Sequence, residues 1–290
     1  MARRLAYLAF FLLVSKSFLG QSTSGKLQFE QGKTLTIQMN IKSSVAQQAG
    51  AQAIDFTVSG LALHSYKVTN ATDDNTTLQH KANKIGFTFD GMGQKRSFDS
   101  DTKEDLDGPF GETVKNILSK NFDMIIDPTG KVLMIRPEKM EPVKTDDRLA
   151  IVFAMLKDIT DVVYPPKKGE ASFFKILPDK ETNKGESWTE SGQNENGKFS
   201  TEYTLTDITD TTIVIDFKGT AVTTTKATMM GMETSTTMNS TNTGKIILDK
   251  ISGIIKEKTI TTESNGNTEA MGGTMPVTSK TTIVIQVKQE

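Results

Sequence analysis

The sequence predicts a mainly β protein, a long curved antiparallel sheet or open half-barrel with two helices packed on one face. Three observations support this fold class. Apolar and polar residues alternate in many segments, threonine accounts for 40 of the 290 residues, and two segments near the middle show helical spacing instead. Successive side chains of a strand point to opposite faces, so alternation over many strands predicts an antiparallel sheet with one dry face and one wet face.

The clearest alternation lies in residues 33–41, whose apolar positions are Leu35, Ile37, Met39 and Ile41. The same pattern returns in residues 54–58, 66–68, 85–89, 199–205, 213–217, 246–248 and 277–287. Threonine occupies many of the opposite positions, and as a β-branched residue it suits a strand face that contacts water. These segments are expected to form the strands of the sheet.

Two segments with helical spacing, residues 111–120 and 146–163, are expected to pack against the dry face of the sheet. Apolar residues of the longer segment recur every three or four positions, which is typical of an amphipathic helix. Thr145 or Asp146 is placed to cap its N-terminus. Pro165 follows its end, because proline cannot continue the hydrogen-bond ladder of a helix.

Residues 21–290 are expected to form a single β-rich domain. Two strand–turn–strand segments occur in the same order in residues 27–136 and 185–290, which would then be duplicated halves joined by a helical segment, residues 137–184. Chance similarity between two threonine-rich hairpins is the alternative interpretation. The matched pairs are residues 66–73 with 203–210 and residues 125–132 with 247–254.

Residues 1–20 have the pattern of a secretory signal peptide, with two arginines, then an apolar run and then small residues. Cleavage is possible after Ser17 or after Gly20, and we favour Gly20, which leaves Gln21 as the N-terminus. Removal of residues 1–20 changes the formal net charge from −1 to −4. The apolar run is shorter than the ~20 residues that span a bilayer. We therefore expect an exported protein, periplasmic or extracellular, with no transmembrane segment after signal removal.

Composition excludes several classes of function. The chain has no cysteine, which excludes disulfides, thiolate catalysis and cysteine-bearing zinc sites. Its 34 basic residues balance 35 acidic ones, so there is no electrostatic basis for binding nucleic acid. The only histidines are His64 and His80, no nucleophile-elbow motif is present, and the acidic run at residues 99–107 lacks the calcium-loop pattern. We predict no catalytic residue, no cofactor and no metal site.

Aromatic residues after the helical segment are the candidates for ligand binding. Phe173 and Phe174 lie in an apolar segment that fits either a short helix or a buried loop, and Trp188 is the only tryptophan. Aromatic side chains line many apolar binding sites. The alternative is that all three belong to the core that joins the helices to the sheet.

A resemblance to known proteins rests on two short segments, Leu177-Pro-Asp-Lys-Glu-Thr-Asn-Lys-Gly-Glu-Ser-Trp188 and Leu248-Asp-Lys-Ile-Ser-Gly253. With these, the chain resembles a family of uncharacterised exported β-rich proteins of the Bacteroidetes group. The resemblance implies a signal peptide, a β-rich first half, a helical middle and a closing β meander. It departs from the family at Glu186, where aspartate is commoner, and it implies no catalytic residue.

The leading hypothesis is a non-enzymatic binding module of the cell envelope, with a lipid, another apolar small molecule or an envelope protein as its partner. It rests on analogy, because a helix-covered concave sheet resembles periplasmic lipid and lipoprotein carriers. Two alternatives stay open: an envelope hydrolase with an unrecognised site, and a structural surface protein.

Overall fold

The structure is a computed structural model that describes residues 22–49, 52–91, 93–143, 149–194, 196–229, 232–270 and 273–290. The predicted signal peptide and its cleavage point at Gly20 and Gln21 lie outside the described residues. The elements, in chain order, are β1 (Ser22–Thr23), β2 (Thr34–Ala49), β3 (Gln52–Ala71), β4 (Thr76–Gly91), β5 (Gln94–Asp99), α1 (Lys103–Leu106), α2 (Gly111–Ser119), β6 (Asn121–Ile126), β7 (Val132–Arg136), α3 (Ala150–Thr160), the 3-10 helix η2 (Asp161–Val163), β8 (Thr182–Asn183), β9 (Ser187–Asn194), β10 (Gly197–Ile208), β11 (Thr212–Met229), β12 (Met232–Asp249), β13 (Ile255–Ala270) and β14 (Gly273–Gln289).

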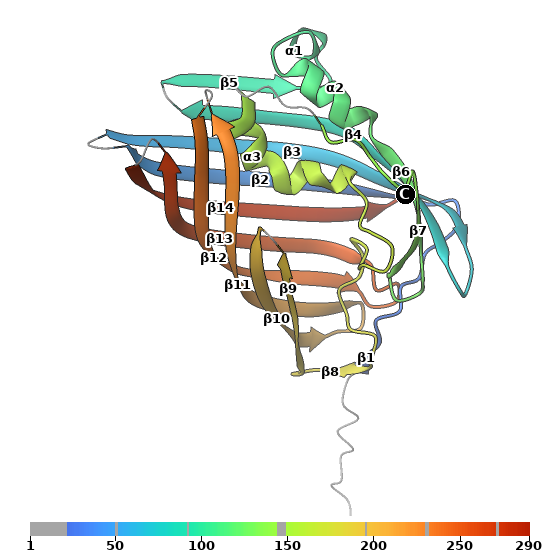
Figure 1. The fold of residues 1–290 in the computed structure, drawn as a ribbon. Helices are drawn as coiled ribbons and strands as arrows, with labels where there is room; N and C mark the ends of the chain where they lie inside the picture. The colour runs from blue at the N-terminus through green and yellow to red at the C-terminus, as the bar shows by residue number, and fades with distance from the viewer. Residues whose placement is uncertain are drawn as a thin grey trace, which may run out of the picture.

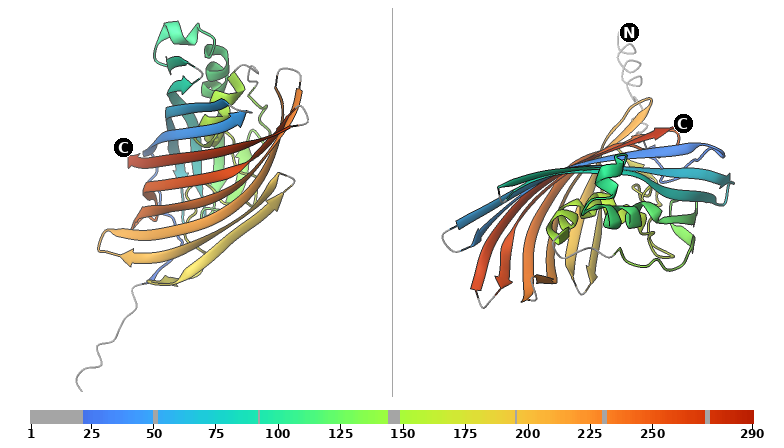
Figure 2. Two further views of the ribbon diagram at one scale, coloured as in Figure 1. Left: turned by 90° about the vertical axis from the view of Figure 1, so that its left-hand side faces the viewer. Right: turned by 90° about the horizontal axis from the view of Figure 1, so that it is seen from above.

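One antiparallel sheet of 12 strands dominates the described residues (Figure 1). Its order is β7-β6-β4-β3-β2-β14-β13-β12-β11-β10-β9, with β5 beside β4. The strands neighbour one another much as they follow along the chain, except where β14, near the C-terminus, pairs with β2. The sheet is strongly curved and stays open between β7 and β9 (Figure 2). The predicted fold class, an open curved sheet with helices on one face, is confirmed.

The helices lie inside the curve of the sheet, on its concave face (Figures 1 and 2). Helix α2 corresponds to the predicted helix 111–120, and α3 followed by η2 corresponds to the later part of the predicted helix 146–163. The proposed caps Thr145 and Asp146 lie outside the described residues. A further short helix, α1, occupies part of the acidic run that follows β5.

The apolar positions predicted from alternation form the core. In β2, Leu35, Ile37, Met39 and Ile41 are all buried. They belong to a large cluster that joins β2–β4, β6 and β14 to the helices. A second cluster joins the inward residues of β10–β13 around Leu205. Because Phe173 packs against both clusters, the chain that follows η2 links the two halves of the core.

A glycine in β3 allows α3 to lie directly on the sheet. An added Cβ at Gly60 would stand 2.5 Å from Leu156 Cδ2, 3.0 Å from Ile41 Cγ2 and 3.2 Å from Ile159 Cδ1. These neighbours are themselves buried, with Leu156 and Ile159 wholly inaccessible to solvent. The missing side chain at Gly60 therefore sets how closely the helix approaches β3.

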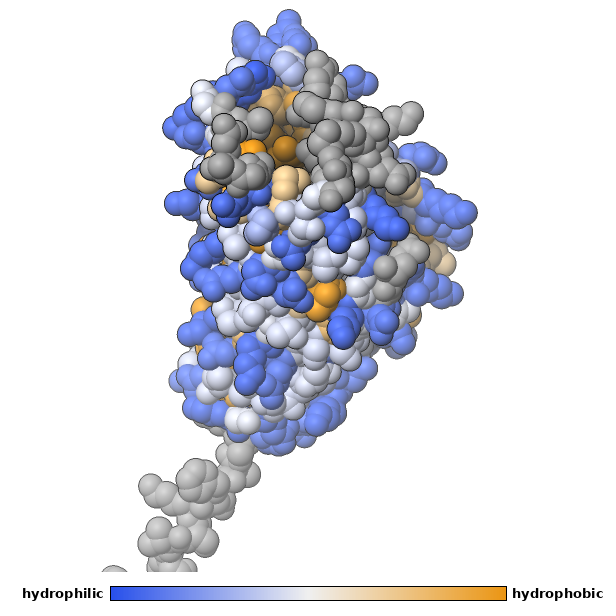
Figure 3. All heavy atoms as spheres, turned by 60° about the vertical axis from the view of Figure 1, so that its left-hand side comes forward, coloured by the Kyte–Doolittle hydropathy of each residue, from blue (hydrophilic) through white to orange (hydrophobic). Residues whose placement is uncertain are grey.

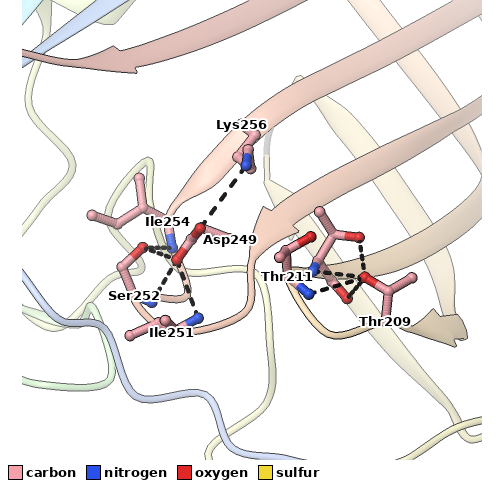
Figure 4. Close-up of polar contacts among 8 residues, drawn as sticks. Thr209, Thr211, Asp249, Ile251, Ser252, Ile254 and Lys256 are labelled. Atoms are coloured by element: carbon pink, nitrogen blue, oxygen red, sulfur yellow. Dashed lines mark hydrogen bonds and ion pairs between the residues drawn. The ribbon is translucent and has the colours of Figure 1, made fainter.

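Two similar turns accept backbone hydrogen bonds from Leu27 and Gln28, which precede β2. The two turns correspond to one pair of the repeated sequence segments. In the turn between β12 and β13, Asp249 Oδ1 accepts hydrogen bonds from the N–H groups of Ile251 (3.1 Å) and Ser252 (2.9 Å) and from the Ser252 hydroxyl (3.0 Å) (Figure 4). Asp127 Oδ1, between β6 and β7, also accepts three hydrogen bonds, from the N–H and hydroxyl of Thr129 and from the N–H of Lys131.

Each of these turns ends in a glycine with positive φ, 84° at Gly130 and 69° at Gly253. The N–H of Leu27 donates to Pro128 O (2.7 Å) in one turn, and the N–H of Gln28 donates to Ser252 O (2.8 Å) in the other. The matched segments thus occupy corresponding places in the two halves of one sheet, whereas their origin by duplication stays a prediction.

We predict that Gly60→Ala destabilises the protein, because the new methyl group overlaps Leu156. Overpacking of this kind costs about 1–3 kcal/mol of the free energy of unfolding, which urea denaturation measures. Gly86→Ala is the matched control, since an added Cβ there meets only Phe98 O at 3.4 Å. That control is expected to be neutral or stabilising by up to about 1 kcal/mol. Equal effects of the two substitutions would contradict the proposed contact.

Candidate functional site

The concave face is covered along only part of its area. Helices α2 and α3 lie over β2–β4, and residues 171–178 pack against the ends of β10–β13, while the remaining concave surface of β9–β14 is uncovered (Figures 1 and 2). We call this uncovered surface the concave trough. Its residues in the distal parts of β12 and β13 are mostly partly exposed, whereas the residues of the opposite face there, such as those at 237–245 and 263–269 that alternate with them, are exposed.

Three aromatic side chains, which we call the aromatic row, lie side by side across the trough. Trp188 in β9 is opposite Tyr203 in β10, which is opposite Phe217 in β11. Residues directly opposite in antiparallel strands share a face, so all three point into the trough. The rings of Trp188 and Tyr203 are stacked with centroids 5.4 Å apart, and the rings of Tyr203 and Phe217 lie 5.7 Å apart.

The next strand offers no side chain to this row, because Gly244 in β12 is opposite Phe217. An added Cβ at Gly244 would lie 2.5 Å from Cζ of the Phe217 ring, so the ring extends over β12. Beyond it lies Lys258 of β13, with Nζ 5.8 Å from the centroid of the same ring. The aromatic row therefore ends beside a lysine.

Charge in the trough comes from Lys258 and Glu190. Burial lowers the pKa of Lys258, and the carboxylate of Glu190 opposes that shift. Burial, with the charge and hydrogen bond of Glu190, raises the pKa of Tyr203 to about 12, so its hydroxyl stays protonated near neutral pH. The indole Nε1 of Trp188 is buried and has no hydrogen-bond partner among the described residues.

Farther along the strands, towards their distal turns, the floor of the trough carries small hydroxyl side chains. They are hydrogen-bonded to one another across the strands, which satisfies them without an apolar core. The concave surface is therefore apolar at one end, while at the other end these hydroxyl pairs lie among apolar side chains such as Phe199 and Val277. The pairs are Ser43 with Thr281 (2.8 Å), Ser240 with Ser264 (2.8 Å) and Thr236 with Thr268 (2.9 Å).

The three ligand-binding candidates from the sequence differ in their surroundings. Phe174 is fully buried and packs edge-on against Tyr66, with ring centroids 5.2 Å apart, so its ring is part of the core. Phe173 is partly buried between the two clusters. Trp188 is also partly buried and packs against the second cluster, but it alone of the three lies on a strand that faces the concave trough.

Sequence reasoning did not select Tyr203, Phe217 or Lys258. A usable signal exists for Lys258, a charged residue on the face of β13 that also carries Ile260. A register shift next to Leu248 interrupts the alternation between β12 and β13 at this point. Without the register of β12 and β13, that signal does not decide whether the side chain of Lys258 points inward or outward.

A second hollow, of about 300 Å³, lies between α2 and α3. Apolar side chains such as Ile117, Phe153 and Ala154 form most of its lining. Its lysine, Lys157, is paired with Asp161 one turn along the chain. As far as the described residues line it, this helix pocket thus offers an apolar surface without an unpaired charge.

The opposite face of the sheet has a groove of about 580 Å³, lined by polar residues such as Asp55 and by apolar ones such as Val45. Lys280 in this groove is paired with Glu263, with Nζ 2.7 Å from Oε1.

Viewed towards the distal turns, the molecule is largely hydrophilic. Apolar side chains gather in a recess at the height of α3, β3 and β4 (Figure 3). A separate, smaller apolar patch lies lower on the same face (Figure 3).

The two histidines lie next to each other in the core. Both are inaccessible to solvent, and His64 Nδ1 is 3.2 Å from His80 Nε2. His64 Nε2 is 3.0 Å from the carbonyl oxygen of Ile159, so this nitrogen carries a proton and donates it. His64 Nδ1 then accepts from His80 Nε2–H, which leaves His80 Nδ1 buried without a partner. Both rings are neutral in this arrangement.

The hydrogen bonds of this histidine pair connect α3 to β3 and β4, and neither ring is accessible to solvent. Burial lowers the pKa of His64, while burial and the charge of His64 lower the pKa of His80 to about 3. No serine or threonine hydroxyl is hydrogen-bonded to either ring among the described residues. The pair therefore has the contacts of packed core residues.

Two other kinds of site are absent from the described part of the chain. No group of three or more histidine, aspartate or glutamate side chains within the described residues is arranged to hold a metal ion. None of the helices in the described part of the chain has the length and apolar character needed to cross a membrane.

Comparison with known families gives one match. Residues 73–137 and 167–255, just over half of the chain, match the model of a Family of unknown function (DUF6263). The chain belongs to this family. The matched residues include Trp188, Tyr203 and Phe217, while Lys258 follows their end. Membership agrees with the resemblance to an uncharacterised family, whereas export and a Bacteroidetes origin stay predictions.

Solved structures show only distant similarity to this DUF6263 chain. A structure titled "Lipid-protein interactions in lipovitellin" has 12% identity and a TM-score of 0.47, over 91% of this chain and 26% of that one. The COG4313 outer membrane channel from Pseudomonas putida F1 has 7% identity and a TM-score of 0.21, over 91% and 98% of the two chains. The chain spans about a quarter of the lipovitellin chain. No curated protein sequence matches it.

We predict that acid destabilises the protein through the histidine pair. Above pH ~6.5 the histidines are neutral in both states, so they give no pH dependence. Below it, the unfolded chain binds a proton that folded His80 takes up only near pH 3. As the pH is lowered below ~6.5, the free energy of unfolding therefore decreases, by up to ~1.4 kcal/mol per pH unit for His80.

Urea denaturation at pH 7, 6 and 5 measures this fall. His80→Gln is the comparison variant, because its amide donates to His64 Nδ1 but does not titrate. It is expected to lose less stability between pH 7 and 5 than the natural protein. Identical pH profiles of the two proteins would rule out His80 as the source.

Proposed function

We propose that the protein is a non-enzymatic binding module of the cell envelope that holds an apolar or amphiphilic small molecule in the concave trough. The observation that carries the proposal is the aromatic row. Trp188 is stacked on Tyr203 on an uncovered concave surface, although its indole N–H has no partner. Trp188 and Tyr203 are partly exposed, whereas Phe217 is buried in the second cluster beside them. Large aromatic side chains left partly accessible on a concave surface are a common feature of ligand sites.

The shape of the concave face supports an amphiphilic ligand in particular. One end of the face is apolar and is filled by the helices and residues 171–178, and the distal end carries paired hydroxyl groups beside the exposed ring of Phe199. The aromatic row lies between these regions. A molecule with both an apolar and a polar part matches this surface better than a fully apolar one does.

The cellular location is supported by the sequence of residues 1–20 alone. The basic start and short apolar run are typical of a secretory signal peptide. The non-enzymatic part of the proposal is supported by the histidine pair, whose burial keeps both imidazole rings away from any substrate.

Trp188 provides the test, because it is the only tryptophan and its emission reports directly on the trough. We expect decanoate or 1-decanol, titrated into the purified protein, to shift that emission in a saturable way. Calorimetry should show binding to Trp188→Ala weakened by at least about tenfold, a loss of ~1.4 kcal/mol of binding free energy. Native mass spectrometry of freshly purified protein should show a bound apolar molecule.

Two control variants separate the trough from other surfaces. Ile251→Ala removes an apolar side chain that is 77% exposed in a turn away from the trough, and it should leave binding unchanged. Ala154→Trp fills the helix pocket and should also leave it unchanged. Loss of binding in Ala154→Trp but not in Trp188→Ala would move the site to the helix pocket. Absence of saturable binding by either probe would refute the proposed function.

A further inference from the structure

Lys258 is a cation placed on the apolar side of a strand. It is opposite Ile246 of β12 and Ile285 of β14, both of which are buried. The neighbouring lysine Lys245 points to the other face of the sheet, where its Nζ lies 4.0 Å from Asp216. Lys258 is thus set apart from the solvated lysines of the same sheet.

The ammonium group of Lys258 lacks a close anionic partner. No hydrogen bond or ion pair to its Nζ occurs among the described residues, and its nearest defined contact is the ring of Phe217. The carboxylate of Glu190 attracts the ammonium group of Lys258, but the two groups are too far apart to form an ion pair. A partly buried ammonium group without an anion is costly, since the Coulomb attraction that offsets its desolvation is missing.

We propose that Lys258 binds the carboxylate head of an alkyl carboxylate whose chain lies against the aromatic row. This inference rests on the proposed function and specifies the ligand class for the same trough. Charge complementarity supports it: the trough offers a cation with free N–H donors directly beside an apolar surface. One monovalent head group is enough to neutralise that cation.

Glu190 is the competing anion in this arrangement. It lies on β9 two residues after Trp188, and its side chain is exposed and acts on both Tyr203 and Lys258. A bound carboxylate takes over the neutralisation of Lys258 while Glu190 remains hydrated. Removal of the Glu190 charge should therefore strengthen carboxylate binding.

The experiment compares decanoate with 1-decanol, which have the same chain length and differ in charge. Calorimetry and Trp188 emission give both dissociation constants. The natural protein should prefer decanoate by about tenfold or more, in keeping with a hydrogen bond to a charged group. In Lys258→Met the preference should vanish while 1-decanol binding is kept. Glu190→Gln should bind decanoate a few-fold more tightly.

Lys245→Met is the matched control, one strand away and on the opposite face. It should keep the full preference for decanoate. Lys258→Met should fold with an unchanged or higher melting temperature, because methionine fills an apolar position of similar volume without burying a charge. If Lys258→Met fails to fold, Lys258→Gln gives the same comparison with a neutral polar side chain.

The outcomes separate the two proposals. If neither probe binds the natural protein, the proposed function itself fails. If both bind equally well, or if Lys258→Met keeps the preference for decanoate, the trough binds ligands but Lys258 does not select a carboxylate. A decanoate preference that is lost equally in Lys245→Met would show a general charge effect and would overturn the assignment to Lys258.

Discussion

The pairing of β2 with β14 joins the two ends of the chain and makes the sheet continuous. Its register runs from Leu35 opposite Gln289 to Gln47 opposite Val277, and Thr34 exchanges two backbone hydrogen bonds with Glu290. Strands so distant in the chain pair at a high cost in loop-closure entropy. Opposed apolar residues offset that cost, since Ile41 meets Ile283 and both are buried. Every other feature of the concave face depends on this junction.

The covering of the concave face follows from the placement of the helices relative to that junction. Helix α3 lies on β2 and β3, where Gly60 allows close approach and where the carbonyl of Ile159 is held by His64. The described residues of the C-terminal half form no comparable helix, and residues 171–178 cover only one end of that half. The ends of these strands that lie farthest from residues 171–178 are instead stabilised by backbone hydrogen bonds between strands and by cross-strand hydroxyl pairs. This unequal covering creates the trough.

Much of the fold was predictable from local pattern, and particular residues show why the rest was not. Alternation from Leu35 to Ile41 placed β2 correctly, but the strand continues to Ala49 through Ser43, where apolar residues no longer mark the inward face. Helix α2 follows the prediction to within a residue, because its apolar stripe is complete within one short segment. Phe173 and Phe174 were ambiguous, since a segment that fills the gap between two clusters has no period of its own.

The sequence by itself determined which segments are strands, which face of each strand is dry and that two helices need an apolar surface to cover, because these properties depend on side chains a few residues apart. Tertiary structure alone decided that Trp188, Tyr203, Phe217 and Lys258 share one surface. Their proximity depends on the register of five strands, and a shift of one residue moves a side chain to the opposite face. Register is set by pairing between distant segments, and no local pattern encodes it.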